Sequence, residues 1–286
     1  MLRPSARRTS AAVETLAFGY GLVEAPRVDG ASNLYFSDAI DGGVYRRAPD
    51  GTMSIVVPKR RGVGGLVLHA DGGVVISGRD VSHVRDGQTR ILLTVEGVLG
   101  FNDLTTDAAG HVLVGSLRSP ALQSENRVPG ELWRIEGAGR AVEVYRDVAF
   151  ANGVGFSPDG RTIYHSSYSE ALVLTHDLAD DGRGVNRRVF ARVPRGNPDG
   201  LAVDEAGAVW VALGSGGGIA RFRPDGGLEH VLAVPAPFVA SLCFGGADRR
   251  DLYVTTSGNS EHPERRGTVF RTRADVPGLV APLARV

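Results

Sequence analysis

The sequence predicts an all-β fold, a six-bladed β-propeller with four-stranded blades, on three observations. Short runs of aliphatic and β-branched residues dominate, and no amphipathic helical periodicity extends over a useful length. Glycine supplies 39 of the 286 residues, well above its usual share of about 7%. Turn glycines recur at steps of 36 to 50 residues, which is comparable with the length of one propeller blade.

Each predicted strand follows a turn of small or polar residues, so the runs look like strands of successive hairpins. The clearest runs are Leu34–Phe36, Val74–Ile76, Val112–Val114, Val209–Val211 and Leu252–Val254. The turn glycines form two interleaved series. The first contains Gly72, Gly110, Gly160, Gly207 and the longer turn Gly246–Asp251; the second contains Gly51, Gly87, Gly137, Gly182 and Gly226. We expect these series to be the first and second hairpins of each blade, all on one face of the disc, and a period of about 45 residues gives six blades.

The two ends of the chain suggest how the ring closes. The first blade begins near Gly21, which leaves the strand Val13–Phe18 unassigned, and the last blade ends one strand short at Thr268–Arg273. We expect the N-terminal strand to complete the last blade, because closure protects the sheet edges. Residues 1–12 are then a flexible tail and residues 13–286 a single propeller domain.

Composition excludes several classes of partner. Lys and Arg number 32 and Asp and Glu number 32, so no broad basic surface is available for nucleic acid or anionic lipid. The apolar runs are too short to span a membrane. The single cysteine, Cys243, cannot form an internal disulfide. We expect a cytoplasmic protein, a monomer or small homo-oligomer, that acts on a small molecule.

Oxygen-bearing side chains recur at one position of the repeat. Asn102, Asn152 and Asp199 each lie eight residues before their turn glycines, and the same alignment selects Glu24 in the first blade. The six equivalent positions are Glu24, Gly64, Asn102, Asn152, Asp199 and Ala240. In a propeller this position begins the strand that lines the central channel, so four polar side chains should converge on the axis, at the face opposite the hairpins.

The chemistry of these four side chains predicts a metal site. Two carboxylates and two amides crowded on one axis are unfavourable unless a cation joins them. Hard oxygen ligands favour Ca²⁺ first, then Mg²⁺ or Mn²⁺, with Zn²⁺ as a further alternative. Taken singly, Asn152-Gly153 and Asp199-Gly200 are common turn dipeptides. Their shared register with Glu24 and Asn102 favours one divalent cation held by Glu24, Asn102, Asn152 and Asp199.

Several motifs resemble the family of senescence marker protein (regucalcin), gluconolactonase and luciferin-regenerating enzyme. They are Leu34–Asp38, Phe101–Asp103, Asn152–Asp159, Pro198–Asp204 with Trp210, Cys243–Gly246 and Leu252–Thr255. The similarity extends from about Gly21 to Leu279. It implies a six-bladed propeller with one axial divalent ion, ligand positions at Glu24, Asn152 and Asp199, and Asn102 as a further channel residue near the metal or the substrate.

The chain also departs from the family pattern. The usual Gly-Glu-Gly-Pro is Val23-Glu24-Ala25-Pro26 here, and the arginine that sugar-lactonases place two residues before their Asn-Asp pair is Gly100. Gly64, Gly100 and Ala240 leave room near the ion. We therefore expect a metal-dependent lactonase whose substrate is a non-sugar or bulky lactone.

The predicted catalytic residues are Asp199, as the base that orients and deprotonates water, and Asn102. Asp103 is a second candidate base or substrate contact, although a solvated turn residue is the favoured interpretation. Arg118 is a candidate clamp for the substrate carbonyl, with an exposed loop arginine as the commoner alternative. Tyr168 and Phe238 are candidates for an apolar wall, with ordinary packing as the alternative. The loops Ser116–Pro129 and Ser257–Arg266 are candidate lids.

Three other functions fit the same pattern. The ring could serve a hydrolase of phosphotriester-type compounds, or an isomerase or cyclase that uses the cation to stabilise an enolate. From a different class, the protein could be a calcium-binding propeller without catalysis. The ligand set alone does not separate these functions.

Overall fold

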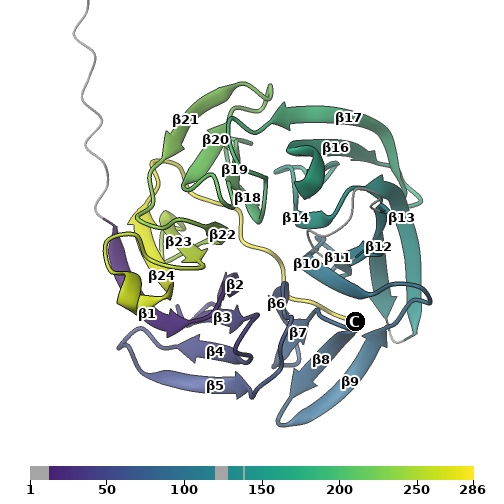
Figure 1. The fold of residues 1–286 in the computed structure, drawn as a ribbon. Coiled ribbons are helices and arrows are strands. Elements are labelled where there is room, and N and C mark those ends of the chain that lie inside the picture. The colour runs from purple at the N-terminus through teal and green to yellow at the C-terminus, as the bar shows by residue number, and fades with distance from the viewer. Residues whose placement is uncertain (1–12, 120–127, 138) are drawn as a thin grey trace, which may run out of the picture.

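Six four-stranded antiparallel sheets surround a central axis in the computed structural model, which describes residues 13–119, 128–137 and 139–286 (Figure 1). Each of the first five blades is a meander of four consecutive strands, which confirms the predicted six-bladed propeller. The strands of the first three blades are β2 (Val23–Val28), β3 (Leu34–Asp38), β4 (Val44–Arg47) and β5 (Met53–Val57); β6 (Leu66–Leu68), β7 (Val74–Ile76), β8 (Val81–Arg85) and β9 (Gln88–Leu93); and β10 (Gly100–Thr106), β11 (Val112–Leu117), β12 (Gly130–Gly137) and β13 (Arg140–Val148).

The other three blades follow the same plan. Their strands are β14 (Ala151–Phe156), β15 (Thr162–Ser167), β16 (Leu172–Leu178) and β17 (Gly184–Arg192); β18 (Leu201–Val203), β19 (Val209–Ala212), β20 (Ile219–Phe222) and β21 (Leu228–Leu232); and β22 (Val239–Gly245), β23 (Asp251–Thr256), β24 (Gly267–Arg273) and β1 (Glu14–Tyr20). Two short 3₁₀ helices, η1 (Tyr168–Glu170) and η2 (Pro263–Arg265), lie between strands in the described part of the chain. None of the helices described there is long and apolar enough to cross a membrane.

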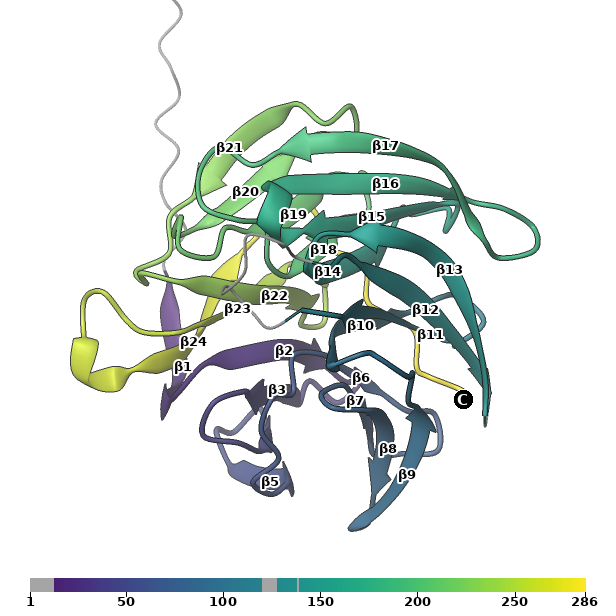
Figure 2. The same ribbon diagram turned by 45° about the vertical axis from the view of Figure 1, so that its right-hand side comes forward.

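Ring closure occurs as predicted. Strand β1 pairs antiparallel with β24, from Glu14 opposite Arg271 to Tyr20 opposite Gly267. The two strands lie side by side in both views (Figures 1 and 2). Residues 1–12, predicted to be a tail, lie outside the described residues, and the division into tail and domain stays a prediction.

The turn glycines occupy the predicted hairpins. Gly72, Gly110, Gly160 and Gly207 join the first and second strands of their blades, with φ between 71° and 92°. These angles lie in the left-handed region, where glycine has no steric penalty. Because each blade is a meander, both hairpins of a blade lie on one face of the disc, called here the hairpin face. The opposite side is called the loop face, and the innermost strand of each blade runs from the loop face to the hairpin face.

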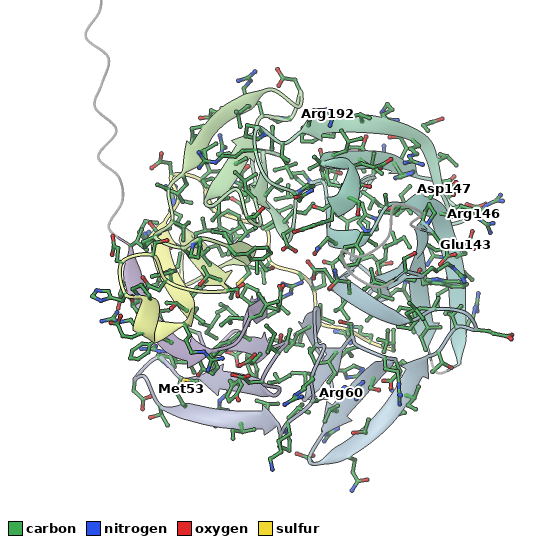
Figure 3. The ribbon with its side chains drawn as sticks, in the orientation of Figure 1. Met53, Arg60, Glu143, Arg146, Asp147 and Arg192 are labelled. Carbon is green, nitrogen blue, oxygen red and sulfur yellow. The ribbon has the colours of Figure 1, made fainter. Side chains whose placement is uncertain are left out.

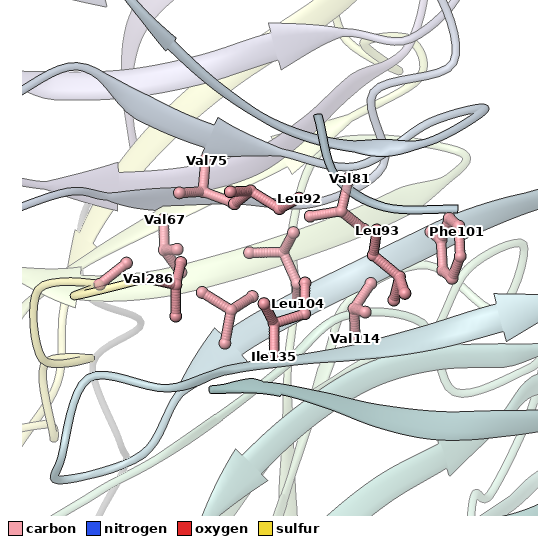
Figure 4. Packing of buried hydrophobic residues seen from close by; sticks show 12 residues of the cluster. Val67, Val75, Val81, Leu92, Leu93, Phe101, Leu104, Val114, Ile135 and Val286 are labelled. Carbon is pink, nitrogen blue, oxygen red and sulfur yellow. The ribbon is translucent and has the colours of Figure 1, made fainter. Parts of the chain in front are cut away.

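The hydrophobic core is divided among the contacts between neighbouring blades. Each of six buried clusters among the described residues joins two adjacent blades, and one of them joins the first blade to the last. The cluster between the second and third blades includes Val75, Leu104 and Ile135 (Figure 4). Charged residues of the outer strands, such as Glu143 and Arg146 of β13, project away from the disc (Figure 3). This packing between neighbouring blades therefore holds the six innermost strands around the axis.

Candidate active site

The six predicted ring positions lie where the innermost strands are irregular. The ladder between first and second strands shifts register between Glu24 and Arg27, between Phe101 and Leu104, between Ala151 and Val154, and between Val239 and Ser241. In the other two blades, Gly64 and Asp199 come two residues before the strand begins. Such irregularities re-aim side chains, and here they recur at the same position around the ring.

Backbone hydrogen bonds tie these positions across blades. The Asp199 N–H donates to the Ala212 carbonyl (2.8 Å), and the Asp199 carbonyl accepts from the Gly153 N–H (3.1 Å). The Gly200 N–H donates to the Ala240 carbonyl at 2.8 Å. Asn102 Nδ2 donates to the Ala151 carbonyl of the next blade at 3.0 Å. The ring is thus held by contacts between neighbouring blades as well as by contacts within a blade.

Small residues at the remaining ring positions make room for the polar ones. A β-carbon on Gly64 would overlap Asn102 Oδ1. The Asn102 carboxamide therefore occupies space that a side chain at position 64 would fill. At the sixth position, Ala240 is fully buried and adds no polar group.

Three carboxyl groups influence one another in this ring. Burial, followed by the charges of Asp199 and Asp103, raises the pKa of Glu24 well above its usual value. Burial and then Asp103 raise the pKa of Asp199 well above normal, against a hydrogen bond from the Asn152 side chain. Buried like charges disfavour ionisation of each other. The protein thus keeps acidic groups together at a cost in electrostatic energy.

The expectation that Asp103 is a solvated turn residue is wrong. It lies within β10 and is 5% exposed. Burial raises its pKa to about 6, opposed by the nearby Arg27 guanidinium, whose Nη2 is 3.8 Å from Asp103 Oδ1. The register shift between Phe101 and Leu104 turns it inward. Asp103 is therefore close enough to Glu24 and Asp199 to affect their charge.

The ring suits a divalent cation. Asp199 Oδ1 is buried without a hydrogen-bond partner in the described part of the chain, whereas buried polar atoms are normally satisfied. No three His, Cys, Asp or Glu side chains among residues 13–119, 128–137 and 139–286 lie close enough to hold a metal by themselves. A bound ion would therefore depend on the amide oxygens of Asn152 and Asn102 as well as on Glu24 and Asp199. This all-oxygen donor set fits a hard cation.

Two of the predicted substrate contacts come together. Phe238 Cε2 and the Tyr168 hydroxyl each lie 3.5 Å from where a β-carbon of Gly214 would stand. Tyr168 also packs edge-on against Phe150, with ring centroids 5.7 Å apart. Tyr168 of the fourth blade and Phe238 of the connection into the sixth blade thus lie close together, and their role as an apolar wall stays a prediction.

Arg118 has a different environment from either alternative considered for it. Its Nε donates to Glu131 Oε1 at 2.6 Å, and its side chain is 26% exposed. Glu131 is itself buried and also accepts from Ser116 Oγ (2.5 Å). The arginine is held at the loop face by a carboxylate partner rather than extending freely into solvent.

The two candidate lids differ in how much is described. Residues 120–127 of the loop Ser116–Pro129 lie outside the described residues. The other loop, Ser257–Arg266, contains η2, and the Ser257 N–H donates to the Phe238 carbonyl at 3.1 Å. This contact links the loop to the apolar wall.

Sequence reasoning missed Arg27 and Glu131. Arg27 follows Glu24 by three residues, beyond the register shift, so counting alternate residues does not place it on the axis. Its Nη2 donates to the Leu104 carbonyl of the third blade at 2.8 Å. Glu131 lies at the start of β12, and no motif distinguishes it. The repeat pattern of the sequence singles out neither residue.

Comparison with known proteins identifies the family of the chain and agrees with its fold. The model of the family described as the SMP-30/Gluconolactonase/LRE-like region matches residues 22–258. The chain belongs to this family. The predicted resemblance is thereby confirmed across most of the propeller.

Relatives within the family are lactonases. The chain is 33% identical over 267 residues to 6-deoxy-6-sulfogluconolactonase of Pseudomonas putida, with 87% of this chain and 90% of that protein covered. It is 31% identical over 232 residues to pentonolactonase XacC of Haloferax volcanii, covering 79% and 77%. The prediction of a lactonase-like enzyme that hydrolyses ester bonds is confirmed at the level of the family.

A solved structure shows the same fold. A calcium-binding protein, regucalcin, from Agrobacterium tumefaciens superposes with a TM-score of 0.84 at 20% identity, covering 96% of this chain and 98% of that one. At this identity the likeness shows the propeller alone. The metal ligands and catalytic residues of the present chain stay predictions.

Proposed function

We propose that this protein is a divalent-metal-dependent lactonase whose site is the axial ring at the loop face. The observation that carries the proposal is the buried, unpartnered Asp199 Oδ1 beside Glu24. Acidic groups with raised pKa values and an orphaned oxygen are expected where a cation completes the site. The names of the two relatives support the reaction class.

Glu24, Asn152, Asp199 and Asn102 are the residues that would hold the ion, with Ca²⁺ as the first candidate. When bound, a divalent cation polarises the lactone carbonyl and stabilises the negative charge that forms on its oxygen. The calcium-binding title of the regucalcin structure supports the choice of Ca²⁺. Mg²⁺, Mn²⁺ and Zn²⁺ are the alternatives to be compared.

The chain's own residues supply proton transfer and orientation. Asp199 is the candidate base that orients the attacking water and accepts its proton. Asn102 is fixed by the hydrogen bond that its Nδ2 donates to the Ala151 carbonyl. Its Oδ1 lies beside Gly64, where it can orient the cation or the substrate. Asp103 lies next to it as a second acceptor for a proton or a substrate hydroxyl.

We propose a bulky or non-sugar lactone as substrate. Gly100 stands where the resemblance implies an arginine that holds sugar hydroxyls. Tyr168 and Phe238 provide an apolar wall. Leu99, at the start of the third blade, is 58% exposed. Because both relatives are named for sugar lactones, aldonolactones are the necessary comparison.

The test is a panel of aliphatic, aromatic and sugar lactones followed by acid release, with the protein in EDTA and then reloaded with each cation. We expect hydrolysis of at least one lactone, its loss in EDTA and its recovery with metal. Asp199→Asn should lower kcat by about 100-fold or more, because the base is removed and an anionic ligand becomes a neutral one. Asp225→Asn, in an exposed turn, is the matched control.

Silence across the panel in protein that binds the cation would overturn the lactonase proposal. Hydrolysis of a phosphotriester instead would assign the protein to the phosphotriester hydrolases. Metal binding without turnover of any substrate would leave a calcium-binding propeller.

A further inference from the structure

A large cavity opens at the end of the channel opposite the ring. Its volume is about 1000 Å³, at the upper end of the roughly 300–1,000 Å³ common for small-molecule sites. Its lining comes from the hairpin-side halves of the innermost strands and from the segment Leu279–Leu283. Hairpin turns, including residues 107–109, residues 157–160 and the second-hairpin turn 179–182, form its rim. It therefore lies on the hairpin face, away from the proposed lactonase site.

The inner walls of this cavity are largely apolar, because residues of the cores between neighbouring blades also line it below the ring. Val154, Leu201 and Leu242 each follow a ring position by two residues, and all three line the cavity. Phe156, Val203 and Phe244 form the next layer. In a strand, residues two apart point to the same side, about 6.6 Å further along. Two levels of apolar residues thus line the cavity between the polar ring and the hairpin turns.

Arg27 is the charged side chain at the inner end of the cavity; the other charged residues of the lining are Arg134 and five aspartates of the hairpin turns, Asp29, Asp107, Asp159, Asp180 and Asp181. Only 14% of the Arg27 side chain is exposed. Its two terminal nitrogens donate to the carbonyls of Pro26 (2.7 Å) and Leu104 (2.8 Å). Nε has no partner among the described residues, and the carboxylate of Asp103 is 3.8 Å from Nη2, beyond hydrogen-bond distance. A guanidinium has five N–H donors, so this cation retains unused donors.

The C-terminal segment crosses the mouth of the cavity. Here the strap denotes residues Gly278–Ala284. Its ends are fixed by hydrogen bonds from Leu279 N–H to the Val203 carbonyl and from Ala284 N–H to the Leu68 carbonyl, both 2.8–2.9 Å. Figure 1 shows this segment in yellow, running across the centre of the ring. Between the two ends, Val280 and Leu283 line the cavity although they are 46% and 45% exposed.

We propose that the hairpin-face cavity is a second small-molecule site, for an organic anion with an apolar body and one carboxylate. The apolar layers and the strap would cover the body of the ligand, and the spare donors of Arg27 would hold the carboxylate. Val280 and Leu283 would lose their exposed apolar surface on binding. This site opens on the other face of the disc from the proposed lactonase site, and Arg27, 3.8 Å from Asp103, lies between the two.

The probe is decanoate, titrated calorimetrically below its micelle concentration into the full chain in EDTA, so that the ring holds no metal. We expect one decanoate per chain. Val280→Asp and Leu283→Asp should each weaken binding about tenfold or more, because a carboxylate would face the hydrocarbon and repel the head group. Val189→Asp is the matched control, since Val189 is 59% exposed on the outer strand β17 and does not line the cavity.

The head group is tested with 1-decanol and with Arg27→Met. The variant should weaken decanoate binding by about 10-fold or more and leave decanol binding unchanged, because a charge-assisted hydrogen bond is lost.

The expected set is decanoate binding that survives EDTA, is weakened about tenfold or more in both strap variants and is unchanged in Val189→Asp. Absence of decanoate binding, or binding unaffected by both strap variants, overturns the proposal. Equal affinity for decanoate and decanol overturns the assignment of a carboxylate. Binding seen only after metal is restored places the anion at the ring instead and also overturns it.

Discussion

The two ends of the central channel are built from the same six strands, yet they have opposite chemistry. At the loop face the strands carry Glu24, Asn102, Asn152 and Asp199, and the ladder is irregular there. At the hairpin face the same strands contribute apolar residues, among them Val154, Leu201 and Leu242, to the lining of a cavity of about 1000 Å³. Register therefore decides which chemistry a strand presents, and a local irregularity is enough to separate a polar site from an apolar one.

The polar end should cost stability when it holds no metal, and Glu24→Gln tests this. Since folding raises the pKa of Glu24, the folded state retains a proton that the unfolded state loses. Stability of the metal-free protein should therefore fall as pH rises from about 4.5 through the folded pKa. The variant should lose about 100-fold or more in cation affinity, yet be about 1–3 kcal/mol more stable than wild type in EDTA at pH 8.

Urea unfolding in EDTA at pH 5 and pH 8, with calorimetry for the cation, measures both effects. A Glu24→Gln protein that is no more stable than wild type at pH 8 would show that the ring carries no electrostatic strain.

The polar end also depends on a missing side chain. Gly64→Ala should displace Asn102, because the new β-carbon would overlap its Oδ1. We expect cation affinity to fall about tenfold and stability to fall by about 1–3 kcal/mol from the overpacking. Gly30→Ala is the matched control, since nothing lies within 4 Å of its β-carbon position. Equal behaviour of the two variants in calorimetry and thermal melting would refute the role of Gly64.

A smaller pH effect arises outside the channel and must be separated from that of the ring. Burial, followed by Arg187 and Arg188, lowers the pKa of His176 to about 4. Its ring stacks on Tyr145 at 3.6 Å between centroids. Here the unfolded state binds the extra proton, so stability should fall as pH drops from 6.5 towards 4.

The variant His176→Phe keeps the aromatic stacking but removes this titration. Between pH 7 and pH 5 its free energy of unfolding should fall by about 2 kcal/mol less than that of wild type, as measured by urea unfolding. His262→Gln, at a 49% exposed side chain, is the control. Parallel pH profiles for His176→Phe and wild type would contradict the prediction.

Much of the ring could be predicted because each blade repeats one turn chemistry. Counting back from Gly110, Gly160 and Gly207 locates three ring positions whatever the strand between them does. Closure could also be predicted, since Val13–Phe18 had no blade of its own; in the structure the strand is Glu14–Tyr20. Because repeated turns mark the blades along the chain, one sequence is sufficient to locate the ring positions and the strand that closes the ring.

The residues that sequence reasoning missed, Arg27 and Glu131, and those whose surroundings it did not foresee, Asp103 and Arg118, are placed by irregular or non-local geometry. Asp103 and Arg27 come just after ring positions, where the register shifts break the alternation of inward and outward residues. The strap has no hydrophobic period, and its position follows from scattered hydrogen bonds, including those to the Val203 and Leu68 carbonyls and one from Thr106 Oγ1 to the Pro282 carbonyl. Arg118 and Glu131 form a pair only because β11 and β12 are adjacent. Such contacts depend on three-dimensional neighbours that a linear pattern does not encode.

Pairing of β1 with β24 also constrains how the molecule assembles. Glu14 and Arg271 are opposite each other, so this contact joins residues more than 250 positions apart in the chain. Contacts of such long sequence separation form slowly, because the entropy of closing the loop must be paid before they stabilise the fold. During synthesis β1 emerges early but cannot pair until β24 has been made. The last blade is therefore the last to form, and until then the ring has two open edges at which a second chain could pair.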